Sequence, residues 1–550
     1  MRTIPLKESL EIEFKSDKKP YPDKELIEDV VGMANVSGGT IFLGVEDDGR
    51  ITGVHEKHND SIGVVALIAN STVPPISARA EIINEEKKDV LRIDVPRSRG
   101  VVATTSGKMR KRKLKLDGTP EVVPMYPYEI PSRLSSLGLL DYSAQALPGA
   151  AYEDIDPNQR IRLKKIIQNR QGGEKNLLSL TDIELDVALR LVTEVGGEYV
   201  PTVAGMLLMG KEGRIAELIP AAKSTFQVLE GTSIRLNEDG TKPLLETLEN
   251  YEMYLKAWNP EEEMEYGLIR MPIPEFDWAA FREGIVNAFC HRDYTVLGSV
   301  RVLIDDEGLS ISNPGGFIDG VNLKNLLTVE PHGRNPALAD AMKRIGLAEK
   351  TGRGIDRIFE GSIMYGRPWP DYSESTSTTV KLFIQRSKAD YSFVKFISDE
   401  QAKRGKPLSI SSLMILSTIK DERRAGVERI AEVTNIDVNK IRAAMENMLE
   451  QGLIEASGKG NHRTFILSKR LYKQNRETVK YVRQTDIDAV RYPELILKLA
   501  KTQDGIITKK DVAELLKISD TQAYVLIKSL RKEGKLELLN SGKYTKYKVK

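Results

Sequence analysis

The segment FREGIVNAFCHRD, residues 281–293, carries chemically active side chains at helical spacing. Glu283, Asn287 and His291 follow one another at four-residue intervals, so on a helix they project from one face. An acid and an amide one turn apart suit a Mg-nucleotide pocket. The amide oxygen can bind Mg²⁺, and the carboxylate can polarise a water for attack on a terminal phosphate. Taken alone, the segment is equally explained by an amphipathic helix whose polar face meets solvent.

Two glycine-bearing turns follow this helix and strengthen the nucleotide interpretation. Glycine allows backbone to approach phosphates closely. SNPGGF (312–317) ends a strand pair predicted over 299–314, and TGRGIDRI (351–358) opens a helix whose N-terminus would favour an anion. With these turns in order, the simple amphipathic-helix alternative loses most of its weight.

The motifs together resemble the GHKL ATP-binding domain of bacterial "ATP-dependent helicase-related" transcription regulators. The matching motifs are REGIVNAFCHRDY, LSISNPGGF, RNPALADAMKRIGL and TGRGIDRI. In that family a Glu-x-x-x-Asn helix supplies the water-activating acid and the Mg²⁺ ligand, which implies these roles for Glu283 and Asn287. No GxxxxGK[ST] loop occurs in the sequence, so the helicase name does not imply a P-loop motor.

The resemblance also implies the remaining contacts to ATP. Asn313, Gly315 and Gly316 match the motif that approaches adenine, although the family usually has aspartate where Asn313 stands, which leaves the base selectivity open. Gly352 and Gly354 match the phosphate-side turn. Family members often close a lid over the nucleotide, and the lid is expected here over 317–350. His291, Arg292 and Asp293 either order the helix end or contact nucleotide, with neither favoured.

The amino-terminal stretches ESLEIEFK (8–15) and NVSGGTIFLGVEDDGRITGV (35–54) resemble the Schlafen, AlbA-like domain. The resemblance implies nucleic-acid binding. In some members three acids bind Mg²⁺ or Mn²⁺ and cleave tRNA or rRNA, and by position these would be Glu8, Glu13 and Asp47. The alternative is that the acids are exposed strand and hairpin residues. Glu8 and Glu13 are five apart, so a catalytic triad needs a bend between them.

A basic stretch in the same domain is expected to hold a nucleic-acid backbone. GKMRKRKLKLDG has six basic residues against one acid. The candidate phosphate contacts are Lys15, Arg110, Lys111, Arg112 and Lys113.

From about residue 390 the pattern helix, helix, helix, hairpin occurs twice, which predicts two winged helices. In a winged helix the third helix enters the major groove and the wing contacts backbone. From Thr521 to Lys550 eight basic residues face two acids, so the second copy favours nucleic acid. The first copy favours protein docking or dimerisation. The candidate contacts in the second copy are Lys528, Arg531, Lys532, Lys543 and Lys546.

The expected fold class is multidomain α/β (α+β). Its parts are a Schlafen/AlbA-like domain (1–130), a connector (131–230), a GHKL α/β-sandwich ATPase domain (231–387) and winged helices at 400–472 and 487–550. The net charge of +2 says nothing about partners, and the single cysteine excludes an internal disulfide framework. Without an apolar signal core or a run of about 18 apolar residues, we expect a cytoplasmic protein that does not contact membranes.

These features predict a protein that binds ATP and nucleic acid, in which a nucleotide switch controls the end domains, with a role in transcription regulation. The alternative is an ATP-regulated, metal-dependent endoribonuclease of antiphage defence that cuts tRNA or other RNA. ATPase activity is possible in either case. A third hypothesis is a self-assembling scaffold whose ATP-binding domains dimerise, and we expect a homo-oligomer. The sequence does not choose between DNA and RNA.

Overall fold

The computed structural model describes most of the chain and divides it into two units. The described residues are 4–115, 118–266, 269–318, 320–330, 333–349, 352–457, 463–468, 471, 492–494, 496, 497, 499, 500, 505–516, 518–540 and 546–549. The first unit comprises 1–260, 276–358 and 370–386; the second comprises 261–275, 359–369 and 387–550. Each unit is described by itself. The mixed α/β, multidomain fold class is confirmed.

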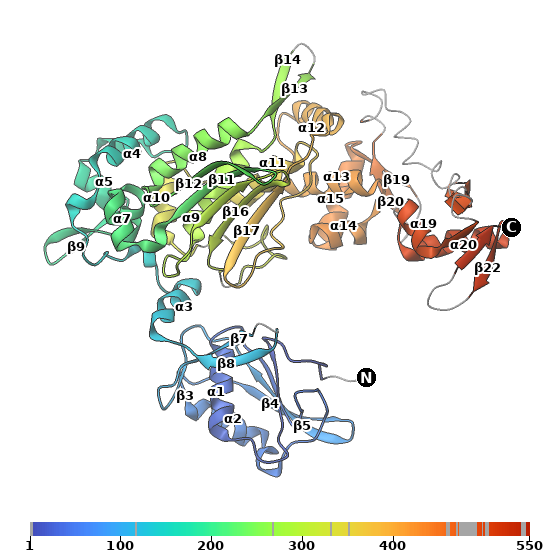
Figure 1. The fold of residues 1–550 in the computed structure, drawn as a ribbon, viewed down its shortest axis with the longest axis horizontal. Helices are drawn as coiled ribbons and strands as arrows, with labels where there is room; N and C mark the ends of the chain where they lie inside the picture. Colours follow the sequence, from blue (N-terminus) through green and yellow to red (C-terminus); the bar gives the residue numbers. More distant parts are fainter. Residues whose placement is uncertain are drawn as a thin grey trace. The chain divides into compact units, whose positions relative to one another are not determined.

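The N-terminal domain is built on a four-stranded sheet in the order β1-β2-β5-β4 (Figure 1). Its elements are β1 (Ile12–Lys15), α1 (Asp23–Ala34), β2 (Gly39–Leu43), α2 (Ser61–Ser71), β4 (Arg79–Glu85) and β5 (Lys88–Val95). Apolar residues of α1 recur every three to four positions and bury Leu26 and Val30 in one core with Ile41. A second cluster around Phe14 and Phe42 also contacts the sheet. A turn forms at Asp48-Gly49, closed by a bond from the Gly49 amide to the Glu46 carbonyl.

The basic stretch forms one strand of a hairpin that the sequence reading did not predict. Its strands are β7 (Arg110–Leu114) and β8 (Pro120–Pro124). The hairpin lies against α1, where a Cβ added to Gly32 would come within 2.8 Å of a Val122 methyl. A short helix, α3 (Ile130–Ser136), follows and leads out of the domain.

The connector is mainly helical. Its elements are α4 (Pro157–Asn169), α5 (Asp182–Ala188), β9 (Val192–Val195), β10 (Glu198–Pro201), α6 (Val203–Met209) and α7 (Glu212–Leu218). The apolar stretch PTVAGMLLMG (201–210) contains α6, which is buried along its whole length. Thr202 caps this helix by accepting a bond from the Gly205 amide. Gly205 packs so tightly that an added Cβ would lie 1.9 Å from the Leu191 carbonyl oxygen.

The central domain is a five-stranded sheet in the order β12-β11-β15-β16-β17. The strands are β11 (Ser224–Glu230), β12 (Ser233–Gly240), β15 (Val300–Ile304), β16 (Gly308–Pro314) and β17 (Thr379–Gln385). β11 runs parallel to β15, and the other neighbours are antiparallel. The strand pair over 299–314 is confirmed. Because β11 begins at Ser224, the sheet starts before the expected boundary at 231.

Helices cover one face of this sheet. They include α8 (Leu244–Trp258), α9 (Trp278–His291), α10 (Pro336–Arg344) and α11, which begins at Gly354 (Figure 1). Phe226 on β11 stacks edge-on against Tyr251 of α8, with ring centroids 5.1 Å apart. Gly284 of α9 lies close to Ile311, since an added Cβ would be 3.0 Å from its methyl. The sheet residues alternate, so β11, β15 and β16 bury one face and leave the other mostly half-buried.

The second unit contains both predicted winged helices. The first copy contains α13 (Ile410–Glu422), α14 (Val427–Thr434), α15 (Val438–Glu450) and a sheet ordered β18-β20-β19, whose first strand lies between α13 and α14. The second copy contains α19 (Lys509–Leu516), α20 (Asp520–Lys532) and a sheet ordered β21-β23-β22, whose first strand comes directly before α19. The strands are β18 (Ala425–Gly426), β19 (Ile454–Ser457), β20 (Thr464–Leu467), β21 (Ile506–Thr508), β22 (Leu536–Asn540) and β23 (Lys546–Val549).

Two further elements of this unit were not predicted. They are α12 (Tyr391–Arg404) and a hairpin of β13 (Glu261–Tyr266) with β14 (Ile269–Pro274). Across the described residues of both units, every helix is too short or too polar to cross a bilayer.

Candidate functional site

All but one of the predicted nucleotide residues line one cavity of about 800 Å³ in the central domain. That volume suits a ligand of drug or cofactor size. The wall is formed by α9, the inner face of β16 and β17, the loop after β16, α10 and the start of α11. The lining residues that the sequence singled out are Glu283, Asn287, His291, Asn313, Gly316, Gly352 and Gly354. Segments about 100 residues apart in sequence, such as α9 and β17, thus meet around one space.

Glu283 is the buried acid of this cavity, with 5% of its surface exposed. Its burial raises the pKa of the carboxyl above the usual value; Arg282 opposes the rise, and a hydrogen bond from the Asn287 side chain opposes it further. The bond also shows that Glu283 and Asn287 project together from α9. A carboxylate with a raised pKa is well matched to taking a proton from water near neutral pH.

Gly354 lets the start of α11 approach this acid. A Cβ added at Gly354 would lie 1.9 Å from Glu283 Oε1, so any other residue would displace the carboxylate. Gly352 has a φ of +72°, which favours glycine. The TGRGIDRI motif therefore has a physical requirement for both of its glycines beside the cavity.

Asn313 lies on the inner face of β16, 4% exposed, beside the apolar Ile311. Its side-chain nitrogen donates to the Pro314 carbonyl 3.2 Å away, which directs the amide. Gly316 also lines the cavity, and an added Cβ would meet the Ser377 carbonyl oxygen at 2.4 Å. Gly315 does not line the cavity; its φ of +94° shapes the turn next to it.

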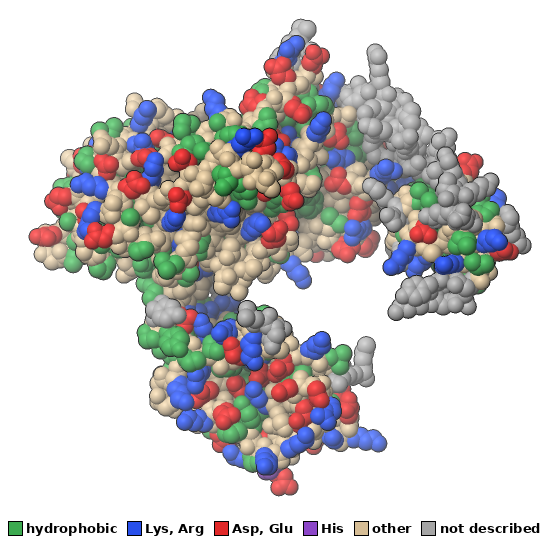
Figure 2. All heavy atoms as spheres, viewed as in Figure 1, with side chains coloured by type: hydrophobic (Ala, Val, Ile, Leu, Met, Phe, Trp, Pro, Cys, Tyr) green, Lys and Arg blue, Asp and Glu red, His purple; other side chains and the backbone are tan. Residues whose placement is uncertain are grey.

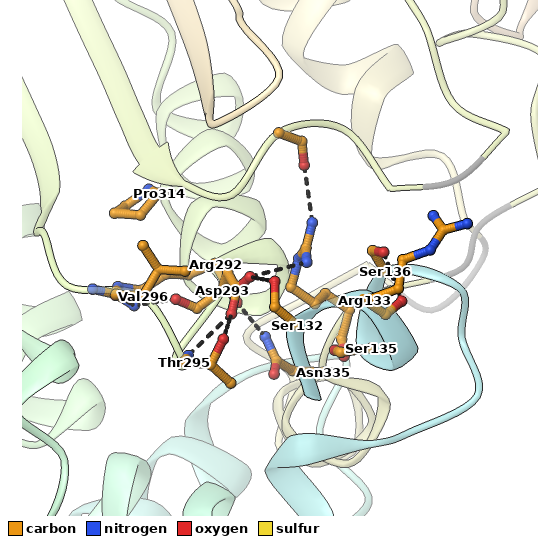
Figure 3. Close-up of polar contacts among 12 residues, drawn as sticks. Ser132, Arg133, Ser135, Ser136, Arg292, Asp293, Thr295, Val296, Pro314 and Asn335 are labelled. Atoms are coloured by element: carbon orange, nitrogen blue, oxygen red, sulfur yellow. Dashed lines mark hydrogen bonds and ion pairs between the residues drawn. The ribbon is translucent and has the colours of Figure 1, made fainter. Parts of the chain in front are cut away.

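At the end of α9, the side chains of His291, Arg292 and Asp293 have different surroundings. His291 lines the cavity. Arg292 is fully buried and donates to the carbonyls of Asp293 at 2.6 Å and Gly298 at 2.6 Å, so it orders the chain after the helix. Asp293 accepts from the Thr295 amide at 3.0 Å and from the Ser132 hydroxyl, as Figure 3 shows.

The sequence did not predict that basic side chains line the cavity. Arg190 of the connector and Lys343 of α10 both line it. Arg190 has an exposed side chain and a φ of +57°, which is uncommon for a residue other than glycine. Nothing in the local sequence marks Arg190, because the connector reaches the cavity only through the tertiary fold. The expected lid also contributes to the wall, through residues such as Leu326, Leu327 and Val329.

The amino-terminal acids are only partly brought together. Ser9 and Ile12 close a bend before β1, and the Phe14 amide donates to Glu8 Oε1 at 2.9 Å. Glu8 is partly buried, which raises the pKa of its carboxyl, and the nearby Glu13 raises it further. The bend that a triad needs is therefore present.

Asp47, in contrast, is exposed at the hairpin turn. Among the residues that the structure describes, no three His, Cys, Asp or Glu side chains are grouped to hold a metal. The charge of Glu13 is met by ion pairs with Lys15 and Arg112 instead. Glu8, Glu13 and Asp47 are therefore not gathered around one metal position, and the nuclease role stays a prediction.

The basic stretch is largely ion-paired within the domain. Arg112, predicted to contact nucleic acid, is buried and donates to the Ser9 and Ile12 carbonyls at 2.9 and 2.8 Å, so its role is to fix the start of β1. The other basic residues of β7 pair with acids. These pairs are Arg110 with Glu28, Lys111 with Glu129 and Lys113 with Glu121. Figure 2 shows both charge signs interspersed on the visible face of this domain.

The second winged helix keeps its basic residues exposed. Lys528, Arg531 and Lys532 lie on the solvent side of α20, beside exposed Tyr524 and Val525. Lys546 is exposed on β23, and Lys543 lies outside the described residues. On α15 of the first copy, by comparison, Arg442 lies 3.5 Å from Glu428.

Three family models match separate parts of the chain. Residues 8–117 match "Schlafen, AlbA_2". Residues 298–383 match "Putative ATP-dependent DNA helicase recG C-terminal". Residues 137–225 match a "Domain of unknown function (DUF8451)". The chain thus joins a Schlafen/AlbA-type domain to a helicase-related ATPase-type domain, as the motifs predicted, and these domains associate it with nucleotide binding and nucleic-acid-related function. Glu283 and Asn287 precede the second matched range.

Solved structures show the fold. The DIP2311 protein from Corynebacterium diphtheriae aligns with 98% of this chain and 95% of its own, at a TM-score of 0.51 and 20% identity. It shares the fold over nearly the whole length. The oxidized form of MarR from E. coli covers 25% of this chain and 84% of its own at a TM-score of 0.12 and 15% identity, too low to compare folds. A search of curated proteins found no match.

Proposed function

We propose that this protein binds ATP and nucleic acid, and that a GHKL-type nucleotide switch controls its N-terminal domain and its winged helices. One observation carries the proposal: Glu283, Asn287, Asn313 and the turns at Gly316 and Gly354 line a single cavity of about 800 Å³. Side chains that merely faced solvent would have no reason to converge in this way.

The cavity offers complementary surfaces for a nucleotide. Ile311 and Leu382 give an apolar wall for a base, and Asn313 gives it a polar partner. The Asn287 carboxamide would hold Mg²⁺ together with phosphate oxygens, and Mg²⁺ needs only one or two protein ligands in such sites. Arg190 and Lys343 would stabilise the phosphates. Bound Mg-ATP would supply the reactive phosphoanhydride, and Glu283 would accept a proton from water.

The winged helices would supply the contact to nucleic acid. Lys528, Arg531 and Lys532 present three cations on one exposed helix, while Tyr524 offers a ring for additional contact. We favour DNA binding in transcription regulation on this basis.

A second function, an ATP-regulated endoribonuclease of antiphage defence, is favoured by the proximity of Glu8 and Glu13 at the bend before β1. A bound Mg²⁺ or Mn²⁺ would have to replace Lys15 and Arg112 as the partners of Glu13. Loss of Mn²⁺-dependent tRNA cleavage in Glu13→Ala, in a protein that still folds, would support this function.

The test of the main proposal is incubation of the whole protein with a fluorescent ATP analogue and Mg²⁺, followed by labelled duplex DNA and tRNA with and without ATP. We expect saturable nucleotide binding that Asn287→Ala weakens at least tenfold, and nucleic-acid affinity that changes with ATP. Light scattering of the same samples reports whether ATP drives the expected self-association. Absence of nucleotide binding would refute the proposal.

A further inference from the structure

The helix α3 connects the N-terminal domain to the rim of the nucleotide cavity. On one side, Arg133 Nη2 donates to the Ser98 carbonyl at 3.2 Å, just beyond β5. Immediately before the helix, Glu129 pairs with Lys111 of the β7–β8 hairpin. These contacts fasten α3 to the N-terminal domain.

The other side of α3 contacts the central domain through two serines. The Ser132 hydroxyl donates to Asp293, and the Ser135 hydroxyl donates to the Arg334 carbonyl at 3.1 Å. Figure 3 shows Ser132 directed at Asp293 and Ser135 on the same helix. Asp293 and Arg334 form an ion pair 3.3 Å long, and their side chains are about 5% exposed or less.

The same ion pair is joined to the wall of the cavity. Arg334 Nη2 donates to the carbonyl of Gly316, which lines the cavity, at 3.1 Å. The neighbouring Asn335 donates to the carbonyls of Cys290 and Arg292 at 2.9 and 2.8 Å, which ties the end of α9 to the start of α10. The turn at Gly316, the end of α9 and the start of α10 therefore meet at one buried cluster. The cluster consists of Asp293, Arg334 and Asn335.

We propose that α3 transmits the nucleotide state of the cavity to the N-terminal domain, with Ser132 and Ser135 as the positioning residues that couple it to Asp293 and Arg334. The inference rests on the proposed nucleotide binding and adds its route of regulation. A buried ion pair is costly to leave half-broken, so the cluster favours discrete arrangements over gradual distortion. A nucleotide that changes the position of the Gly316 turn or of Arg334 must therefore also change the contacts that α3 makes with Asp293 and Arg334.

The test uses the full chain and the double variant Ser132→Ala/Ser135→Ala. The matched control is Ser136→Ala, because the Ser136 hydroxyl donates only within α3, to the Arg133 carbonyl at 2.8 Å. Amide hydrogen exchange of α3 and of residues 8–115 is followed with and without a non-hydrolysable ATP analogue and Mg²⁺. Binding of a fluorescent analogue is measured on the same samples.

We expect nucleotide to change exchange in α3 about fivefold or more in the wild type and in Ser136→Ala, a size typical of coupling between sites. The double variant should keep its nucleotide affinity within about threefold and lose most of that response. If the serines had a purely structural role, the double variant would change the amide hydrogen exchange of α3 by the same amount with and without nucleotide. Two results overturn the inference alone: bound nucleotide with no change in wild-type α3, or a double variant that responds like the wild type. Failure of the wild type to bind nucleotide overturns the proposed function as well.

Discussion

At the scale of single residues, the proposed chemistry depends on Glu283, an acid that α9 buries beside an amide. Its place beside Asn287 could be predicted because Asn287 follows one turn later and the local spacing fixes a shared face. Its raised pKa could not, because the rise comes from burial, and the start of α11 that lies against the carboxylate is about 70 residues further along the chain. Arg112 illustrates the converse: a basic run predicts phosphate contact, but the tertiary fold turns this one side chain inward to Glu13.

Replacing Glu283 with glutamine should lower ATP turnover about 10²- to 10⁴-fold while leaving ATP affinity nearly unchanged, the usual effect of removing a general base. The ionised carboxylate of Glu283 is the active form. Because the pKa of Glu283 is raised, this carboxylate loses its proton at a higher pH than an ordinary glutamate does. Turnover of the wild type should therefore rise with pH through a midpoint above the ordinary glutamate range. Phosphate release measured from pH 5 to 9 tests this.

Asp340→Asn serves as the control, since Asp340 is an exposed acid that also lines the cavity. The assignment of Glu283 fails if Asp340→Asn reduces turnover as strongly, or if Glu283→Gln keeps the wild-type rate.

Arg190→Ala should weaken ATP binding about tenfold or more, because one charge-assisted hydrogen bond contributes about 1.5–3 kcal/mol. Adenosine has no phosphates, so its affinity should stay within about twofold. Calorimetric titration with both ligands separates the effects. Equal losses for ATP and adenosine would mean that Arg190 supports the cavity wall and does not contact phosphate.

At the scale of elements, periodicity predicted most of what folds locally and missed what depends on distant partners. The strand pair over 299–314, α9 and both winged helices have clear alternation or helical spacing and are present. β11 falls within the range expected for the connector, whereas its pairing with β12 and with β15, some 75 residues later, makes it part of the central sheet. The docking of α3 on Asp293 joins residues 161 apart in sequence, which no local pattern encodes.

The two third helices of the winged domains should differ in nucleic-acid binding. Replacing Lys528, Arg531 and Lys532 on α20 with alanine should weaken binding at least tenfold and reduce the slope of log affinity against log salt by about 2–3, close to 0.9 per lost phosphate contact. The control is Lys440→Ala/Arg442→Ala on α15, whose Arg442 already has an acidic neighbour. Fluorescence anisotropy across a salt series measures both. An unchanged slope in the α20 variant would assign that helix to protein docking.

At the scale of the whole molecule, the order of the domains was predicted from motifs, and the matched families agree with it. What remains a proposal is that the domains communicate. If ATP alters nucleic-acid affinity by some factor, nucleic acid must alter ATP affinity by the same factor, because coupling between binding sites is reciprocal. The ratio of ATP affinities measured with and without saturating nucleic acid should therefore equal the ratio of nucleic-acid affinities measured with and without saturating ATP. Unequal ratios would show that the two ligands do not act through one equilibrium.

The central claim is that the cavity between α9, β16 and α11 is a nucleotide site. The most direct measurement is a crystal structure of the protein with Mg²⁺ and a non-hydrolysable ATP analogue. We predict density for the nucleotide in this cavity, with Asn287 at the metal, Asn313 at the base and Gly352 and Gly354 beside the phosphates. A cavity filled by protein side chains, or a nucleotide bound elsewhere, would contradict the account.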